Sequence, residues 1–339
     1  MSKIFHGMDV DRLLRIKGDR GYGVSIALNK GDDIETFCSG SGRFGQAFPV
    51  NKDMLFQAAS ISKPVFAMTL LRYADRGLID IDADISGVVS DFVKIPVTFS
   101  ALMSHTAGFN VGGFDGYCAD APVLTLEDVL SGRGNSPKIR RIRPYGKQFR
   151  YSGGGITLAE LAFTRITGTT LQDAFKKEIA EPLGLIRSGY FQPLDEDLVS
   201  NAAFGGRLAE KEDPEHGYHY YPEHAAAGLW TTPAELTKIG IALSRSVRRG
   251  GLLKKETACR MVTAVMDGCG LCIFSDDHIP DQVGHTGGNE GFISYWTVSL
   301  TEDLCAAGMI NRSSSEHVIG NLFKIIDGLI EEEKRSRKT

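Results

Sequence analysis

Apolar and β-branched residues gather into short runs at both ends of the chain, and this pattern indicates β-strands. Near the start, GVSIALNKGDDIETFCSGSG predicts two strands joined by a turn at Lys30–Asp33. Near the end, GFISYWTVSL and LCAAGMIN predict two more strands, separated by Thr301–Asp303. The apolar stretch CGLCIF, Cys269–Phe274, also reads as a strand. Strands are therefore expected at both ends of the chain.

Helix-start signals recur in the middle of the chain. Thr157 and Thr232 each stand three residues before a glutamate, which is the capping-box spacing, and Pro233 occupies the favoured first helical position. Thr98 and Thr125 are expected to cap two further helices. The middle of the chain is therefore expected to be mostly helical.

The order of strands, helices and strands predicts an α+β fold. Because the two strand-rich ends pair into one sheet only if the chain returns to it, we expect an antiparallel sheet flanked by terminal helices. One helix is short and N-terminal, and the other runs from about Ser315 into the charged tail. Residues 1–69 and 216–339 would form this α/β lobe, and residues 70–215 a mostly helical inserted lobe. The cleft between the lobes is the expected place for an active site.

Composition and charge exclude several classes of protein. Hydrophobic residues make up 42% and charged residues 24% of the 339 positions, as in ordinary globular proteins. The formal net charge of -4 argues against nucleic acid as a partner. No apolar run has the length of a signal-peptide core or a membrane span, so we expect a cytoplasmic protein with no membrane partner. The six cysteines are too scattered for a disulfide scaffold, and reduced thiols are expected.

Ser60–Lys63 (SISK) is the one Ser-x-x-Lys sequence in the chain. The segment that follows, PVFAMTLLRYADRGL, has helical apolar spacing, so Ser60 would lie at a helix N-terminus with Lys63 one turn further along the same face. The positive end of the helix would favour an alkoxide at Ser60, and the Lys63 amine would lie within hydrogen-bond reach of it. Taken alone, the pattern also fits a surface serine and lysine at the start of an ordinary helix.

Two further motifs make the interpretation specific. Tyr151–Gly153 (YSG) leads into a predicted helix, and His285–Gly288 (HTGG) precedes a predicted strand. The order Ser-x-x-Lys, Tyr-Ser-x, His-Thr-Gly resembles the penicillin-recognising serine enzymes, which include class C β-lactamases, D-alanyl-D-alanine peptidases, D-aminopeptidases and related esterases. Leu102–Gly108 (LMSHTAG) and the segment AAAGLWTTPAEL resemble two further parts of this family. The resemblance spans roughly residues 20–325 and implies a β-lactamase/transpeptidase-like fold.

The resemblance implies a role for each motif residue. Ser60 would attack a carbonyl group and form an acyl-enzyme, while Lys63 and Tyr151 would share the proton as a coupled pair. Backbone N–H groups of Ser60 and Gly288 would form the oxyanion hole. His285 would belong to the catalytic set. The substrate would contact Gly153, Thr286 and Gly287.

Two departures from the family pattern bear on the substrate. Many members carry Tyr-x-Asn, whose amide holds an acylamido side chain, and Gly153 lacks that group. Many also carry Lys-Thr-Gly, whose ammonium attracts a substrate carboxylate. His285 replaces that lysine, and a neutral imidazole attracts a carboxylate poorly at pH 7, although we expect it to gain charge toward pH 6. Short-chain aryl esters are therefore expected to be better substrates than penicillins.

Other features near the motifs are open to two interpretations. Tyr218 and Tyr220 either line an acyl pocket and contact the substrate, or cap the interface between the lobes. The basic run Lys138–Arg150 is typical of a solvated loop, but its position before Tyr151 leaves open a role in attracting an anionic substrate. His105 reads as a hydrogen-bonded turn residue rather than a catalyst.

Neither a metal nor a cofactor is expected. Histidines are dense between His216 and His224, but Gly and Pro interrupt any regular ligand spacing. Cys269 and Cys272 have no second cysteine pair with which to complete a zinc site.

The motifs favour a serine esterase or amidase that acts on a small ester or amide. A β-lactamase or D-alanyl-D-alanine peptidase is one alternative, and an acyltransferase that passes the acyl group to an acceptor other than water is another. A binding module without catalysis is disfavoured because Ser60, Lys63 and Tyr151 are all present. The sequence leaves the oligomeric state open.

Overall fold

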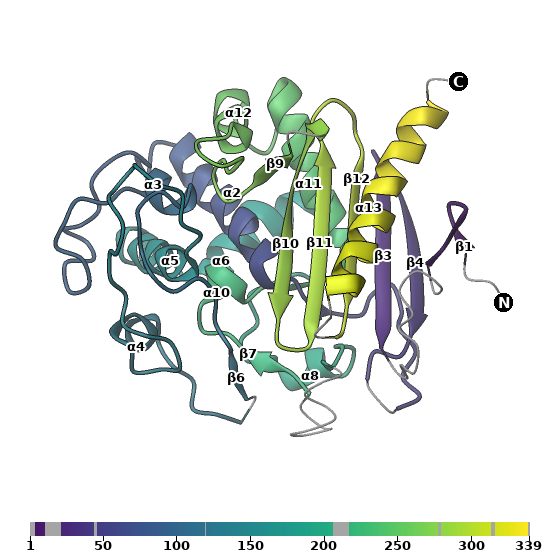
Figure 1. Ribbon diagram of the computed structural model, residues 1–339, viewed down its shortest axis with the longest axis horizontal. Helices are drawn as coiled ribbons and strands as arrows, with labels where there is room; N and C mark the ends of the chain where they lie inside the picture. The colour runs from purple at the N-terminus through teal and green to yellow at the C-terminus, as the bar shows by residue number, and fades with distance from the viewer. Residues whose placement is uncertain are drawn as a thin grey trace.

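A six-stranded antiparallel sheet, in the order β4-β3-β12-β11-β10-β9, forms the centre of the computed structural model (Figure 1). The model describes residues 4–10, 22–43, 46–118, 120–205, 217–276, 279–312 and 316–337. Pairing of β3 with β12 joins strands from the two ends of the chain, as expected. The strand bounds are Asp33–Gly40 (β4), Gly23–Lys30 (β3), Cys305–Ile310 (β12), Phe292–Ser299 (β11), Ile279–Asn289 (β10) and Phe274–Asp276 (β9).

The turns of the sheet follow the sequence signals in one hairpin and depart from them in another segment. Lys30 pairs with Asp33 across the β3–β4 hairpin, which confirms the turn predicted there. The strand predicted over Cys269–Phe274 is wrong for most of its length, since β9 begins only at Phe274. The reason is that Cys272 takes a left-handed φ of 61°, which is incompatible with an extended strand.

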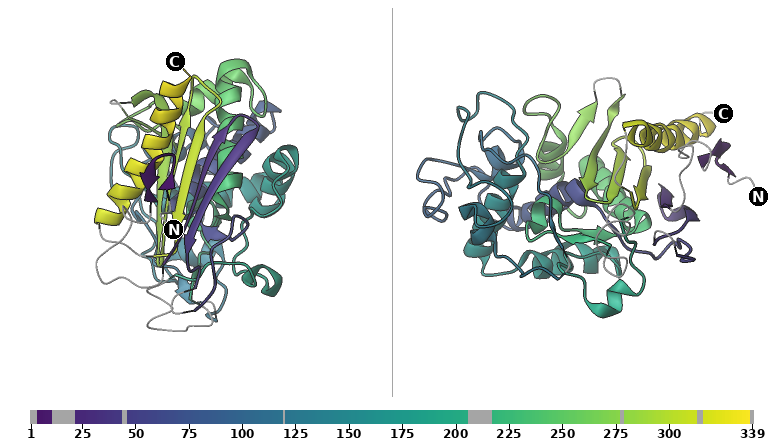
Figure 2. Two further views of the ribbon diagram at one scale, coloured as in Figure 1. Left: turned by 90° about the vertical axis from the view of Figure 1, so that its right-hand side faces the viewer. Right: turned by 60° about the horizontal axis from the view of Figure 1, so that its bottom comes forward.

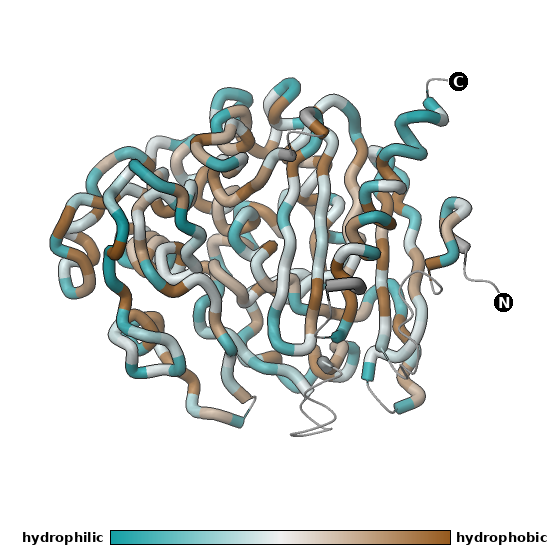
Figure 3. Tube along the Cα trace, in the orientation of Figure 1, coloured by the Kyte–Doolittle hydropathy of each residue, from teal (hydrophilic) through white to brown (hydrophobic). Residues whose placement is uncertain are grey.

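Helices cover both faces of the sheet (Figure 2). Helix α13 (Glu316–Ser336) lies on one face and confirms the predicted C-terminal helix, whose charged end is hydrophilic in Figure 3. Helix α11 (Pro233–Arg249) lies on the other face, where a Cβ at Gly240 would come within 2.4 Å of the Cys305 sulfur. Strand β12 is consequently buried along its whole length, which accounts for its continuous apolar sequence. The α13 side chains that are buried against the sheet are Leu322, Ile325, Ile326, Leu329 and Ile330.

The remaining elements lie mainly between β4 and β9 in the chain, and α3, α4 and α5 form the part of the molecule farthest from α13 (Figure 1). The helices are α2 (Ser62–Asp75), α3 (Phe99–Met103), α4 (Leu126–Ser131), α5 (Gly153–Thr167), α6 (Leu171–Phe175), α7 (Glu181–Leu183), α8 (Glu196–Val199), α10 (His224–Ala227) and α12 (Lys255–Val262). A π-helical turn, Lys176–Ala180, joins α6 to α7. Three short strand pairs complete the described chain: β1 (Ile4–Phe5) with β2 (Met8–Asp9), β5 (Phe56–Gln57) with β8 (Trp230–Thr231), and β6 (Tyr117–Cys118) with β7 (His219–Tyr220).

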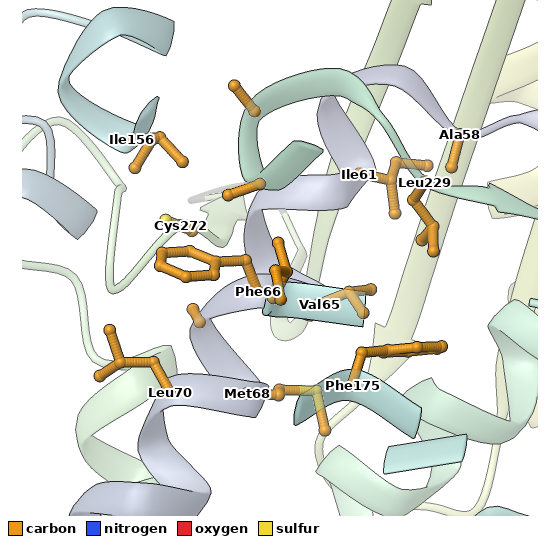
Figure 4. Close-up of a cluster of buried hydrophobic side chains, with 14 of the residues drawn as sticks. Ala58, Ile61, Val65, Phe66, Met68, Leu70, Ile156, Phe175, Leu229 and Cys272 are labelled. Atoms are coloured by element: carbon orange, nitrogen blue, oxygen red, sulfur yellow. The ribbon is translucent and has the colours of Figure 1, made fainter. Parts of the chain in front are cut away.

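Helix α2 runs through the centre of the main hydrophobic core (Figure 4). Val65, Phe66 and Met68 on this helix are 0% exposed, and they lie among Ile156 of α5 and Phe175 of α6. A helix that is surrounded by apolar side chains holds its first turn in a fixed place. Since that first turn follows Ser60 directly, the core positions the candidate nucleophile.

The predicted helix caps are confirmed in three cases and wrong in one. Thr98, Thr125 and Thr232 each accept a backbone N–H at the start of a helix. Thr157 does not, because α5 begins four residues earlier, where the Ser152 hydroxyl accepts the Gly155 N–H. The strong cap at Ser152 outweighs the low helix propensity of the three glycines that follow it.

Two predicted features fall on parts of the chain that the structure does not describe. The expected N-terminal helix precedes Gly23, where residues 11–21 lie outside the described residues, and the predicted domain boundary at 215/216 lies in residues 206–216. The other predicted boundary, at 69/70, falls inside α2, so the division into lobes stays a prediction. Among the described residues, no helix is long and apolar enough to span a membrane.

Candidate active site

Ser60 lies in a strained turn that leads directly into α2. The turn is a 3-10 segment, Ala59–Ile61, and Ala59 takes a left-handed φ of 51°, which is unusual for a residue with a side chain. The strain is held from both sides, because Ser294 donates to the Ala58 carbonyl at 2.7 Å and Ser62 donates to the Ala59 carbonyl at 2.5 Å. Such over-determined strain is found mostly at functional sites.

Lys63 lies one helical turn beyond Ser60, and its ammonium is almost completely buried. The residue is 2% exposed, and its Nζ donates to Ser60 Oγ at 2.8 Å and to the Ala226 carbonyl at 2.6 Å. The predicted placement of serine and lysine on one helical face is confirmed. Nζ also lies 5.0 Å from the centre of the Tyr151 ring, so the three predicted proton-handling residues are neighbours.

Tyr151 is held by His105, a residue that the sequence indicated only as part of a turn. The two rings pack with their centroids 4.5 Å apart. His105 has a left-handed φ of 56°, its carbonyl accepts the Arg150 N–H at 2.8 Å, and its Nδ1 accepts the Ser152 N–H at 3.2 Å. His105 thus fixes the backbone on both sides of Tyr151. Burial, together with the charge of Lys63, holds the pKa of His105 well below its usual range.

His285 is a neutral imidazole on β10. Its Nδ1 donates to the Thr286 carbonyl at 2.5 Å, which leaves Nε2 as an acceptor, and Nε2 is buried without a partner among the described residues. Burial first, and the nearby charge of Lys63 second, lower the pKa of His285 to about 3. The expectation that His285 gains charge toward pH 6 is therefore wrong, because an imidazolium at this buried position would lie beside the Lys63 ammonium.

A cavity of about 830 Å³ brings five of the predicted site residues together. Its described walls include aromatic rings and two aspartates, Asp267 and Asp327, but no lysine or arginine. The predicted residues on the wall are Ser60, Tyr151, His285, Thr286 and Gly288. The described wall residues therefore include no cationic side chain that would pair with a substrate carboxylate.

Two glycines of the motifs are needed because other chain segments approach them closely. A Cβ at Gly287 would lie 2.2 Å from the Ala58 carbonyl oxygen, so only glycine lets β10 pass this close to the turn before Ser60. A Cβ at Gly153 would lie 2.8 Å from the Phe114 ring, so an asparagine would displace that ring. A Cβ at Gly288 would meet nothing within 4 Å, in agreement with its position on the cavity wall.

Tyr218 and Tyr220 are not among the described residues that line the cavity. Tyr218 is 3% exposed and packs edge-on against Trp230, with ring centroids 5.4 Å apart. Tyr220 is 0% exposed, stacks on Tyr117 and donates to the Pro122 carbonyl at 2.5 Å. Both rings pack between neighbouring segments, which agrees with the interpretation that they lie at an interface.

The weaker sequence candidates also lie away from the described cavity walls. In the basic run, Arg141 and Arg150 donate to the backbone carbonyls of Pro96 and Phe109. His216 lies outside the described residues. Among the residues that the structure does describe, no group of three His, Cys, Asp or Glu is arranged to hold a metal ion.

Sequence reasoning missed several residues that complete the site. The Ala226 carbonyl holds Lys63, and Phe274 packs its ring 5.3 Å from that of His285. Asn289 follows the His-Thr-Gly-Gly motif directly and donates through Nδ2 to Gln57 Oε1 at 2.7 Å. The position of Asn289 next to the motif could have indicated it from the sequence. The role of the Ala226 carbonyl could not, because every residue has a backbone carbonyl.

Comparisons with known proteins agree with this geometry. The family model described as Beta-lactamase matches residues 10–326. Penicillin-binding protein 4* of Bacillus subtilis (strain 168) is 22% identical over 186 residues, which are 54% of this chain and 41% of that protein. Esterase EstB of Burkholderia gladioli is 24% identical over 181 residues, which are 49% of this chain and 46% of that protein. The chain thus spans less than half the length of these curated relatives.

Solved structures share the fold. The D-amino acid amidase from Ochrobactrum anthropi SV3, complexed with L-phenylalanine amide, superposes with a TM-score of 0.76 at 19% identity, covering 97% of this chain and 100% of that one. The octameric penicillin-binding protein homologue from Pyrococcus abyssi superposes with a TM-score of 0.72 at 22% identity, covering 91% and 73%. The α+β fold class is confirmed by these likenesses. Because the family match extends over nearly the whole chain, this protein belongs to the beta-lactamase family.

Proposed function

We propose that the protein is a serine hydrolase that forms an acyl-enzyme on Ser60 and acts on small esters or amides. The observation that carries this proposal is the contact of 2.8 Å between Lys63 Nζ and Ser60 Oγ, because Ser60 lines a cavity together with Tyr151. Lys63 and Tyr151 take the serine proton as Ser60 attacks the carbonyl carbon, and the pair returns it to the leaving group. Water then attacks the acyl-enzyme and releases the acid.

The backbone N–H groups of Ser60 and Gly288 stabilise the oxyanion in this proposal. A two-residue turn makes Asn289 and Phe292 the closing pair of the β10–β11 hairpin. Backbone groups alternate in an antiparallel ladder, so the N–H of Gly288 points away from β11, toward the edge of β10 that faces Ser60. Each oxyanion donor contributes roughly 3 kcal/mol in well-studied hydrolases.

Walls without a described cation favour a neutral substrate over a penicillin. The groups that relatives use for the carboxylate and the acylamido arm are replaced by a neutral His285 and by Gly153. The rings of Phe274 and Tyr151 supply apolar surface for an aryl or short acyl group. The names of two similar proteins, an esterase and a D-amino acid amidase, agree with this substrate class.

Intact-mass spectrometry tests the proposal after exposure to aryl esters, cephalosporins and a fluorophosphonate. We expect one adduct on the wild type and none on Ser60→Ala. Ser275→Ala is the matched control, because Ser275 lines the same cavity and its hydroxyl bonds only to the Gly268 carbonyl among described groups. An adduct on Ser60→Ala, or equal ester and cephalosporin turnover by the wild type, would contradict the proposal. Transfer of the acyl group to an added alcohol or amine would instead identify an acyltransferase.

The cytoplasmic location stays a prediction.

A further inference from the structure

Glu160 is a buried carboxyl group that the proposed mechanism does not use. It lies on α5, is 2% exposed, and accepts the backbone N–H of Ala225 through Oε2 at 2.7 Å. Ala225 belongs to the short helix α10, so this contact joins α5 to α10. Burying a carboxyl group is costly, and a group retained at that cost invites a functional explanation.

Helix α10 holds two parts of the candidate site through its carbonyl groups. The Ala226 carbonyl accepts Lys63 Nζ at 2.6 Å, and the Ala227 carbonyl accepts Asn289 Nδ2 at 3.1 Å. Asn289 directly follows Gly288, the proposed oxyanion donor. The position of α10 therefore affects both Lys63 and the end of β10 at Asn289.

Helix α5 positions a third part of the candidate site, Tyr151. It begins at Gly153, two residues after Tyr151, and Glu160 lies two turns further along the same rigid element. The Glu160–Ala225 contact thus links the helix behind Tyr151 to the segment that holds Lys63. A shift of about 1 Å between these groups is enough to reduce catalysis strongly.

The surroundings of Glu160 keep it protonated at neutral pH. Burial raises the pKa of Glu160 to about 8, and the carboxyl of Glu223, the N-cap residue of α10, adds to this effect. Burial raises the pKa of Glu223 as well, to about 7. His224 Nδ1 lies 3.5 Å from Glu160 Oε1, and burial lowers the pKa of that imidazole to about 4. The proton therefore resides on Glu160, whose O–H faces His224. Tyr190 also faces the group, while Glu127 and Asp128 on α4 are partly exposed and paired with Arg165 and Arg133.

We propose that protonated Glu160 is a positioning residue, which fixes α10 so that the Ala226 carbonyl keeps Lys63 beside Ser60. When Glu160 ionises, its charge repels the carboxylate of Glu223 at the start of α10, and the resulting shift of α10 takes the Ala226 carbonyl away from Lys63. The inference rests on the proposed function, because Lys63 acts here as the proton carrier for Ser60. Its pH signature is a loss of kcat as the pH rises through about 8.

Two variants separate positioning from a general packing role. Glu160→Gln keeps an acceptor for Ala225 N–H and a donor toward His224, and cannot ionise. We expect its kcat at pH 7 to lie within about twofold of wild type and its alkaline loss of kcat to disappear or to move up by about one pH unit or more. Glu160→Leu removes the acceptor, and we expect kcat to fall about tenfold or more with KM nearly unchanged.

Glu178→Gln is the matched control, since Glu178 is also buried but pairs with Arg72 and Arg76, away from α10. It should leave the alkaline limb unchanged. The same alkaline midpoint in wild type and Glu160→Gln, or a folded Glu160→Leu with wild-type kcat, would overturn the inference. If Glu160→Leu does not fold, the comparison of wild type with Glu160→Gln decides alone.

A crystallographic comparison separates failure of this inference from failure of the proposed function. If the wild type turns over no ester or amide and Ser60 forms no adduct, the proposed function fails. The distance from Lys63 Nζ to the Ala226 oxygen, compared between wild-type crystals at pH 7 and at about pH 9.5, then tests the positioning role on its own. Lengthening at high pH in the wild type, but not in Glu160→Gln, supports it, and an unchanged distance overturns it.

Discussion

Lowering the pH should not help this protein to accept an anionic substrate, because His285 stays neutral. With a pKa of about 3, roughly one imidazole in 300 is protonated at pH 5.5. With the ordinary pKa of about 6.5, roughly nine in ten would be protonated at that pH. A charge-assisted hydrogen bond to a carboxylate contributes about 1.5 to 3 kcal/mol, or roughly 10- to 150-fold in kcat/KM. The two charge states therefore predict clearly different pH profiles.

The assay uses two acetate esters that differ only in charge, 3-carboxyphenyl acetate and 3-carbamoylphenyl acetate. The measured quantity is the ratio of their kcat/KM values between pH 5 and pH 7.5, a range in which the carboxyphenyl ester stays ionised. The ratio cancels the titration of any group that affects both esters equally. We expect the ratio to change by less than about twofold over this range.

His285→Lys supplies the missing charge and His285→Asn is its neutral control. The lysine variant should raise the ratio of anionic to neutral turnover by about tenfold or more, and the asparagine variant should leave it flat. A wild-type ratio that climbs about tenfold with a midpoint between pH 6 and pH 7 would refute the reasoning. That result would mean that the His285 ring is hydrated rather than buried beside Lys63.

Three further predictions follow from the geometry. Lys63→Ala and Tyr151→Phe should each lower kcat for an aryl ester by about a hundredfold or more. The kcat of the double variant should be little lower than that of the worse single variant, because the two residues act as a unit. Losses that multiply in the double variant would show that they act independently. Gly153→Asn should lower the free energy of unfolding in urea by about 1 to 3 kcal/mol, because its Cβ would come within 2.8 Å of the Phe114 ring, and a second change, Phe114→Ala, should recover part of this loss. His224 has a pKa of about 4, so its contribution to stability is present above its ordinary pKa of about 6.5 and is lost as the pH falls through 6.5 toward 4. His224→Gln should therefore unfold less steeply with acid over this range when followed by circular dichroism, and an unchanged acid slope would contradict the shift.

Local patterns predicted the parts of the site that depend on neighbouring residues in the chain. The spacing of Ser60 and Lys63 brings the two side chains together where the 3-10 turn continues into α2, because helical geometry brings residues three apart together. The β3–β4 turn and the caps at Thr98 and Thr125 are local in the same sense. The start of α5 is also set locally, because the Ser152 hydroxyl accepts the Gly155 N–H there, four residues before the cap that the sequence predicted at Thr157.

Tertiary packing decided the states of the side chains. Nothing in the motif around His285 indicates that its imidazole is buried beside an ammonium, yet burial and that charge set its pKa. The same holds for Tyr218 and Tyr220, whose aromatic rings suit a pocket and an interface equally well until their neighbours are known.

The sequence by itself determined the fold class and the order of the motifs, because these follow from hydrophobic periodicity and from spacing within single elements. The resemblance of those motifs to the penicillin-recognising serine enzymes then indicated Ser60 as the candidate nucleophile. Only the tertiary structure placed Tyr151 and His285 on one cavity wall with Ser60, and only it revealed the Ala226 carbonyl and the Glu160 carboxyl behind Lys63. The physical reason is that contact between residues far apart in the chain, and the desolvation that shifts a pKa, depend on how all the elements pack together. Those quantities have no period or spacing that a sequence displays.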